Sequence, residues 1–164
     1  MNMNPSSFSS SASPQVPSEQ ERKFYYFGLQ TAPVLVARTS TAPWEAPPSG
    51  TDTGSDTNPE AYARRKVVRL VGDHPTKHLW GGELEPKFHT LLDSMEVKQT
   101  DVDIIRIGFD GEPPLSAPVI LWIEVIPGSL ASTDVITVAQ KCRKILEDYG
   151  INDVDVEIHE PLVT

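Results

Sequence analysis

Apolar residues recur at helical spacing in two parts of the chain. The first predicted helix spans Glu83–Val97, with Pro86 in its first turn, where a missing N–H costs little. Its apolar stripe consists of Leu84, Phe88, Leu91, Leu92 and Met95. The second runs from about Thr133 to Tyr149, and Gly150 supplies the left-handed residue that ends it. Its stripe consists of Val135, Val138, Ala139, Cys142, Ile145, Leu146 and Tyr149.

Strand patterns surround these helices. Runs rich in β-branched and aromatic residues predict strands at Lys66–Val71, Asp103–Phe109, Val119–Ile126 and Asp153–His159. A turn region is expected at residues 72–82, because Pro75 and a glycine pair interrupt it. The resulting order is β-α-β-β-α-β, which predicts an α+β, ferredoxin-like two-layer sandwich with two helices on one face of an antiparallel sheet.

The first sixty residues are more polar and richer in proline than the rest. We predict a disordered Ser/Pro-rich tail over residues 1–20 and a Pro/Gly-rich linker over residues 41–60. Between them, residues 21–40 are expected to form short strands that pack on the domain, and residues 61–164 form that α+β domain. The short strands lie around Phe24–Leu29 and Val34–Ala37.

The strand Val119–Ile126 is apolar on both faces. One face carries Val119, Leu121, Ile123 and Val125, and the other carries Ile120, Trp122 and Ile126. A strand of this kind is normally buried on both faces. The second face therefore needs a cover, which can be the N-terminal strands, a second copy of the chain or another protein. In the last strand, by contrast, Asp155 and Glu157 are expected to face solvent.

The second face is the candidate interaction face, and it includes one carboxylate. Its predicted members are Ile104, Arg106, Ile120, Trp122, Glu124 and Ile126. A partly buried carboxylate needs a partner, and Arg106 shares the face if the hairpin pairs residues whose numbers sum to an even value. Such a cross-strand ion pair contributes roughly 0.2–1 kcal/mol. It can be structural, or it can be a specificity element within an interface.

Charge and composition limit the classes of function. A net charge of −9 argues against nucleic-acid binding, which needs clustered cations. The one basic cluster, Arg64–Arg69 with Lys77, can meet a phosphate or an acidic partner, or can balance charge within the domain. No apolar run is long enough for a membrane span, and no secretory signal is present. With a single cysteine as well, the expected location is cytoplasmic or nuclear.

No catalytic, cofactor-binding or metal-binding residue is predicted. His74 and His78 have the i, i+4 spacing of two metal ligands, but Pro75 separates them and no third ligand is apparent. Cys142 falls on the apolar stripe of the second helix, which favours a buried structural thiol. Pro127-Gly128-Ser129 lacks the pattern of a nucleophile elbow. We therefore expect no cofactor and no metal.

Several blocks carry a family resemblance. PVLVARTSTAPW, PEAYARRKVVRLVGDHP, LLDSMEVKQTDVDIIRIG, PVILWIEVIPGSL and DVDVEIHEPLVT together resemble a family of uncharacterised fungal proteins, over residues 25–164. Longer members look as though they continue into a region similar to trypsin-like proteases, which has no counterpart in this chain. The resemblance implies that the chain corresponds to their N-terminal domain, as a short version or a truncated form, and that the N-terminal strands belong to the domain.

Two functions follow from these observations. The first is a non-enzymatic protein-interaction or regulatory domain that uses its apolar sheet face to form a homodimer or to dock a protein partner. The alternative is a ligand-binding or protease-associated N-terminal domain whose catalytic part lies elsewhere. An RNA-binding sheet is disfavoured, because such a sheet needs exposed aromatic residues on a basic surface.

Overall fold

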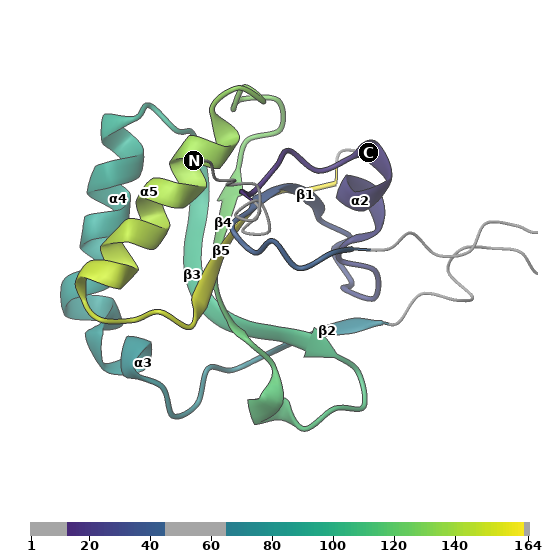
Figure 1. Cartoon of the computed structure of the whole chain (residues 1–164), viewed down its shortest axis with the longest axis horizontal. Helices are drawn as coiled ribbons and strands as arrows, with labels where there is room; N and C mark the ends of the chain where they lie inside the picture. The colour runs from purple at the N-terminus through teal and green to yellow at the C-terminus, as the bar shows by residue number, and fades with distance from the viewer. Residues whose placement is uncertain (1–12, 45–64, 163–164) are drawn as a thin grey trace, which may run out of the picture.

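Five strands form one curled, mixed sheet in this computed structural model, which describes residues 13–44 and 65–162 (Figure 1). The strands are β1 (Val34–Arg38), β2 (Lys66–Arg69), β3 (Gln99–Phe109), β4 (Val119–Val125) and β5 (Val154–Glu160). Their order across the sheet is β1-β5-β4-β3-β2. Most of the predicted tail and linker lies outside the described residues.

The ferredoxin-like prediction is wrong. The helix between β4 and β5 is a crossover that places these strands side by side and parallel, whereas every other neighbouring pair is antiparallel. β1 then adds to the far edge of β5 as a fifth strand. The physical reason lies in β2, which has two cations among its four residues and is suited to an edge. The strongly apolar β4 takes an interior position, with β3 and β5 as its neighbours.

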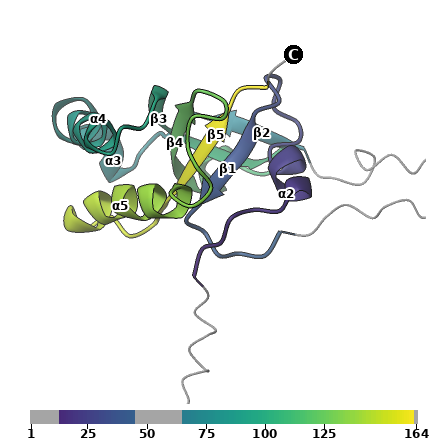
Figure 2. The ribbon, with the colours of Figure 1, turned by 90° about the horizontal axis from the view of Figure 1, so that it is seen from above.

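Helices lie on both sides of this sheet. The helices α3 (Pro75–Leu79), α4 (Glu85–Ser94) and α5 (Val135–Asp148) lie on one side, and α2 (Glu19–Phe24) lies on the other (Figure 2). The predicted stripes of the two long helices are confirmed, because Phe88 and Leu92 of α4 and Cys142 and Leu146 of α5 are buried in one core with the sheet. Gly150 has a φ of 76° and follows α5 as predicted.

Of the predicted turn at residues 72–82, only residues 72–74 are non-helical, and the rest is helical. His74 caps α3, because its side chain accepts a hydrogen bond from the Thr76 backbone, and Pro75 occupies the first turn. A π-helical turn, η3 (Trp80–Leu84), then links α3 to α4. Gly81 and Gly82 have open space around them, so the helix carries both glycines without a packing conflict. The helix therefore begins earlier than the apolar stripe indicates.

The segment Phe24–Leu29 is not a strand. Ser18 caps α2, whose first turn is acidic and whose last turn is basic, an arrangement that complements the helix dipole. Turns follow α2 and lead to β1, which is a strand as predicted. The backbone oxygen of Phe27 accepts a hydrogen bond of 2.7 Å from the Lys66 N–H, so this turn reaches β2 at the opposite edge of the sheet.

Both faces of β4 are buried, as its sequence predicts. The first core lies between the sheet and α4 and α5, and it includes Leu121 and Ile123 of β4. The second core lies on the other face and consists of Tyr26, Leu35, Ile105, Ile107 and Ile120, with Tyr25, Leu29 and Trp122 packed against it. The N-terminal segment therefore supplies the cover for the second face.

Gly28 tests this arrangement. It has a φ of 108°, and a Cβ atom there would lie 2.6 Å from the Lys66 backbone nitrogen. We expect Gly28→Ala to lower the free energy of unfolding by about 3 kcal/mol or more, because strain and overpacking add. Gly111 is the matched control: its φ is 93° and its surroundings are open, so Gly111→Ala should cost only about 1–2 kcal/mol. Urea unfolding measures both, and equal losses would contradict the close approach.

Candidate functional site

The register of β3 and β4 changes the membership of the predicted interaction face. Asp101 lies opposite Glu124 and Asp103 lies opposite Trp122, so the partner numbers sum to an odd value. Ile104 and Arg106 therefore lie on the helix-covered face, where Ile104 belongs to the first core. Both were wrongly predicted for the interaction face, and Ile105 and Ile107 take their places.

The predicted ion pair between Glu124 and Arg106 is absent. The Arg106 guanidinium is buried and donates hydrogen bonds of 2.7, 3.2 and 2.7 Å to the backbone oxygens of Val71, Leu115 and Ala117. Glu124 is half-buried and instead accepts a 2.9 Å hydrogen bond from the Thr100 hydroxyl. Each charged group therefore has its own partners, on opposite faces of the sheet.

The remaining predicted residues lie at different depths. Ile120 is buried in the second core and Trp122 is half-buried against it. Ile126 follows the end of β4 and is 48% exposed. The face on which the sequence analysis placed docking is thus occupied by the chain itself, through Tyr25, Tyr26, Leu29 and Leu35.

A buried carboxylate fixes this cover to the sheet. Glu157 of β5 is 3% exposed, so the prediction that it faces solvent is wrong. The Tyr26 hydroxyl donates a 2.7 Å hydrogen bond to one carboxylate oxygen, and the Tyr25 hydroxyl donates a 3.1 Å bond to the other. The Trp122 indole N–H in turn donates to the Tyr26 oxygen at 3.1 Å. Both carboxylate oxygens of Glu157 are therefore bonded to the N-terminal segment.

The half-buried Lys66 lies near the Glu157 carboxylate and packs on the Tyr25 ring. Its ammonium nitrogen lies 3.4 Å from the centre of the Tyr25 ring, a cation–π contact. Burial lowers the pKa of Lys66 to about 8, and the nearby Glu157 carboxylate partly opposes that shift. Burial also raises the pKa of Glu157, and the positive charge of Lys66 partly offsets this. The pKa values of Tyr25 and Tyr26 are raised, first by burial and then by the Glu157 charge, so both hydroxyls stay protonated donors.

His159 lies beside the same cluster. Its ring stacks on Trp122 with centroids 3.9 Å apart, and its Nε2 atom is 4.0 Å from a carboxylate oxygen of Glu124. Its Nδ1 atom is buried and has no hydrogen-bond partner among the described residues. Burial lowers the pKa of His159 to about 4, so the ring is neutral at physiological pH.

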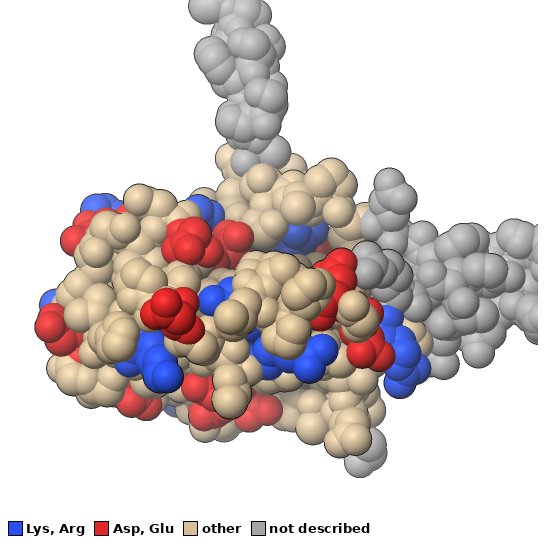
Figure 3. Space-filling model, turned by 90° about the horizontal axis from the view of Figure 1, so that it is seen from below, with Lys and Arg blue, Asp and Glu red and all other residues tan. Residues whose placement is uncertain are grey.

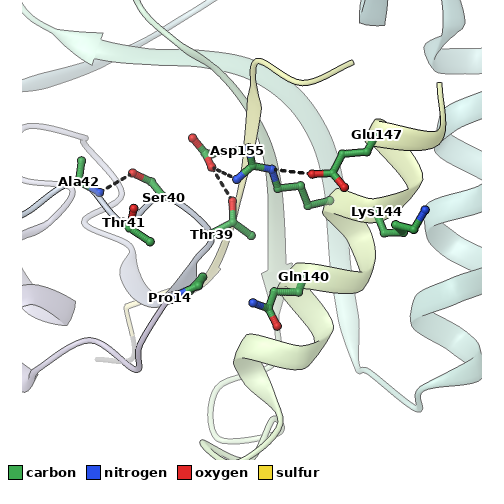
Figure 4. A pocket seen from close by; sticks show the side chains of 10 residues that line it. Pro14, Thr39, Ser40, Thr41, Ala42, Gln140, Lys144, Glu147 and Asp155 are labelled. Atoms are coloured by element: carbon green, nitrogen blue, oxygen red, sulfur yellow. Dashed lines mark hydrogen bonds and ion pairs between the residues drawn. The ribbon is translucent and has the colours of Figure 1, made fainter. Parts of the chain in front are cut away.

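A polar hollow lies on the other side of β5, between α5 and residues 39–42 (Figure 4). Its volume is about 840 Å³. Asp155 accepts hydrogen bonds of 2.7 Å from the Thr39 hydroxyl and 3.1 Å from the Arg143 guanidinium, and Arg143 Nε lies 3.6 Å from Glu147. The sequence analysis missed this hollow because its two walls are far apart along the chain and neither carries a recognisable motif.

An apolar surface lies beside the β2 edge of the sheet. We define the β2-edge surface as Val68, Leu70 and Leu115, which are 45%, 87% and 61% exposed. Leu115, from the β3–β4 connection, contacts the turn after β2, because a Cβ atom on Gly72 would lie 2.9 Å from its side chain. The molecule seen from below shows intermixed basic, acidic and uncharged groups and no single charged field (Figure 3).

The other residues considered from the sequence have structural contacts. His74, besides capping α3, lies 3.0 Å from Asp153, and Cys142 is buried with its pKa raised to about 12 by that burial. The Ser129 hydroxyl donates to the Ile126 backbone oxygen. In residues 13–44 and 65–162, no group of three or more His, Cys, Asp or Glu side chains could hold a metal ion. No helix in these ranges is long and apolar enough to cross a membrane.

Tyr26→Phe tests the cover. The variant removes a buried donor from Glu157, so we expect the free energy of unfolding to fall by about 1–3 kcal/mol. Tyr149→Phe is the control, because its hydroxyl makes an exposed 3.1 Å bond to Glu83 and its loss should cost below about 0.5 kcal/mol. Similar losses in the two variants, measured by denaturant unfolding, would show that Glu157 does not depend on Tyr26.

His159 gives the structure a pH dependence with a defined sign. Its folded pKa of about 4 lies below the ordinary 6.5, so between these values the unfolded chain binds more protons. The stability that His159 contributes is therefore present above the unfolded pKa of 6.5 and is lost as the pH falls toward the folded pKa of about 4. From pH 7 to pH 5 this group should remove about 2 kcal/mol.

We expect His159→Phe, which keeps a ring against Trp122, to abolish that part of the loss. Glu157 contributes with the opposite sign in the same pH range, but it is present in both proteins and cancels in their difference. His78→Phe, at an exposed position, is the control. Unfolding free energies at the two pH values provide the comparison, and an unchanged pH slope in His159→Phe would refute the assignment.

Comparison with known proteins assigns no function. No protein-family model, curated protein or solved structure matches the chain. The resemblance to uncharacterised fungal proteins stays a prediction.

Proposed function

We propose that the protein is a non-enzymatic interaction module that docks a protein partner at the β2-edge surface. The observation that carries this proposal is the exposure of Leu70, at 87%, and of Leu115, at 61%, on two segments that the Arg106 guanidinium holds together through the backbone oxygens of Val71 and Leu115. Single exposed leucines are ordinary, but two on neighbouring segments at the end of an edge strand make a surface that a partner can bury. The proposed docking surface is therefore the edge of the sheet and not the sheet face predicted from the sequence.

The two edges of the sheet differ in a way that supports this location. At the β1 edge, Arg22 of α2 donates a 3.0 Å hydrogen bond to the Leu35 backbone oxygen. A helix side chain therefore satisfies a backbone acceptor on the open edge of this strand. At the β2 edge, the Phe27 oxygen meets only the Lys66 N–H, at the start of the strand. No other described residue outside β3 bonds to the backbone of Val68 or Leu70. Proteins usually protect such edges, because an exposed edge recruits other chains.

The non-enzymatic character is supported by where the titratable groups lie. Four groups with shifted pKa values, Lys66, Glu157 and the two tyrosines, lie together beneath the N-terminal cover. Their shifts follow from holding that cover in place. A buried thiol at Cys142 fits the cytoplasmic or nuclear location that we propose.

The polar hollow favours a second candidate function, the binding of a small polar ligand. Its volume of about 840 Å³ falls within the usual range of ligand sites. Its charged groups, however, already pair with one another through Asp155, Arg143 and Glu147. A rise in melting temperature with a small ligand, lost in Arg143→Gln, would favour this candidate over the first.

The test of the proposed function is site-specific photo-cross-linking in cells of the native host. A photoreactive residue at position 70 should capture one defined protein, whereas the same residue at position 126, which is also exposed, should not. With that partner purified, Leu70→Ser should weaken binding about tenfold or more, because a leucine loses its buried surface. Ile126→Ser is the control and should bind as the unaltered chain does.

Two results would contradict the proposal. One is equal capture from positions 70 and 126, which would mean that the cross-linking is non-specific. The other is a purified partner whose affinity is the same for Leu70→Ser and the unaltered chain. Capture of a second copy of this chain from position 70 would identify the partner as the homodimer expected from the sequence.

A further inference from the structure

We infer that the β2-edge surface receives an extended segment in which apolar residues alternate with acidic ones, bound as an additional strand of the sheet. This inference rests on the proposed function and names the kind of partner. Three observations support it: the direction of the backbone groups of β2, the side chains that flank them, and an uncompensated pair of arginines.

The backbone of β2 presents hydrogen-bonding groups toward the open edge. The Asp110 N–H bonds to the Arg65 oxygen, so residues 65, 67 and 69 direct their backbone groups to β3. The intervening residues direct theirs away from β3, as the bond from Lys66 to Phe27 shows. Val68 follows the same alternation, and Leu70 comes directly after the end of the strand. No residue in the described ranges occupies the edge from Val68 onward, and a partner strand can pair there through main-chain bonds.

The side chains of β2 alternate in character between its two faces. Val68 lies opposite Ile107, on the face that contains the second core, and its exposed side chain continues that apolar surface outward. Arg69 lies opposite Arg106, on the other face. The side chains of a strand added beside β2 would alternate between the same two faces. Those on the face of Val68 would be apolar, and those on the face of Arg69 would be of another kind.

Arg69 and Arg106 specify the charge of those other residues. They are directly opposed across β2 and β3, a like-charge arrangement that disfavours the pair. Arg106 satisfies its donors with backbone oxygens, which leave its charge unneutralised. Neither arginine makes an ion pair with a carboxylate among the described residues. An acidic residue beside Arg69 would supply the missing charge.

The extent of the edge limits the binding mode. The Lys66 N–H is already bonded to Phe27, and the chain leaves the strand after Arg69, so few main-chain bonds are open to a partner. The apolar contact with Leu70 and Leu115 must therefore add to them. This favours a short extended segment over a folded sheet edge, because a segment can pair with the edge and also bend over the leucines.

The experiment uses a short, end-blocked peptide that alternates valine with glutamate, titrated into the full chain labelled with nitrogen-15. We expect saturable shifts of the Val68 and Leu70 amide resonances and slower hydrogen exchange at both. A peptide with lysine in place of glutamate should bind at least about threefold more weakly, the factor expected for a cross-strand charge pair. The glutamate peptide with alternate backbone nitrogens methylated should not bind, because it cannot form the strand hydrogen bonds.

Arg69→Glu is the decisive variant, and Lys77→Glu is the matched control of equal charge change at an exposed helix position. Arg69→Glu should reverse the preference between the two peptides, whereas Lys77→Glu should keep it. Equal binding of the two peptides, or binding of the methylated one, would overturn the inference. Shifts at Val68 and Leu70 with a single-stranded oligonucleotide but with neither peptide would overturn it as well, and would make the arginine pair a phosphate site.

The outcomes separate this inference from the proposed function. If cross-linking at position 70 finds a partner that Leu70→Ser weakens, but the peptides show no charge preference, the docking surface stands and the acidic strand is refuted. If position 70 captures nothing specific and no peptide shifts Val68, both fail together.

Discussion

The Glu157 carboxylate is the constraint on which the rest of the structure depends. A carboxylate on an interior strand, covered by aromatic rings, carries a desolvation cost that only specific partners offset. Its partners are two tyrosine hydroxyls from the N-terminal segment and the nearby charge of Lys66 from the opposite edge of the sheet. This carboxylate of β5 therefore interacts with the N-terminal segment and with the edge strand β2. The cover over Trp122 is therefore part of the fold.

The curl of the sheet follows from the same cover. Tyr25 and Tyr26 fill the second face, and the turn after them reaches β2 through the bond from Lys66 to Phe27. Gly28 permits this approach, because any side chain there would meet the backbone of residues 65 and 66. A sheet that is bonded to one segment at both edges has to bend around it. A flat two-layer sandwich, with one face open, is incompatible with that bonding.

The sequence predicts the elements better than their arrangement, for reasons that particular residues make clear. The stripes of α4 and α5 are unambiguous because apolar residues recur at one spacing only. In the strand around Ile104–Ile107, three of four residues are apolar, so alternation cannot decide which face each occupies. The register assumed from the sequence differs by one residue from the observed one, and it therefore assigned Arg106 to the wrong face. Glu157 and His159 alternate with apolar residues as solvent-facing positions do. Their burial depends on tyrosines more than a hundred positions away, which no local pattern reveals.

The proposed docking surface differs from the predicted one for a related reason. Sequence patterns identify a face that needs burying, but they do not say whether the chain buries it itself. Once Tyr25, Tyr26, Leu29 and Leu35 occupy that face, the surface left for a partner is the edge that the cover does not reach. Arg22 closes the β1 edge, and the turn at Phe27 closes only the start of β2. The same segment that removes the predicted docking face thus defines where the edge stays open, at Val68 and Leu70, beside an arginine pair that lacks an acidic partner among the described residues.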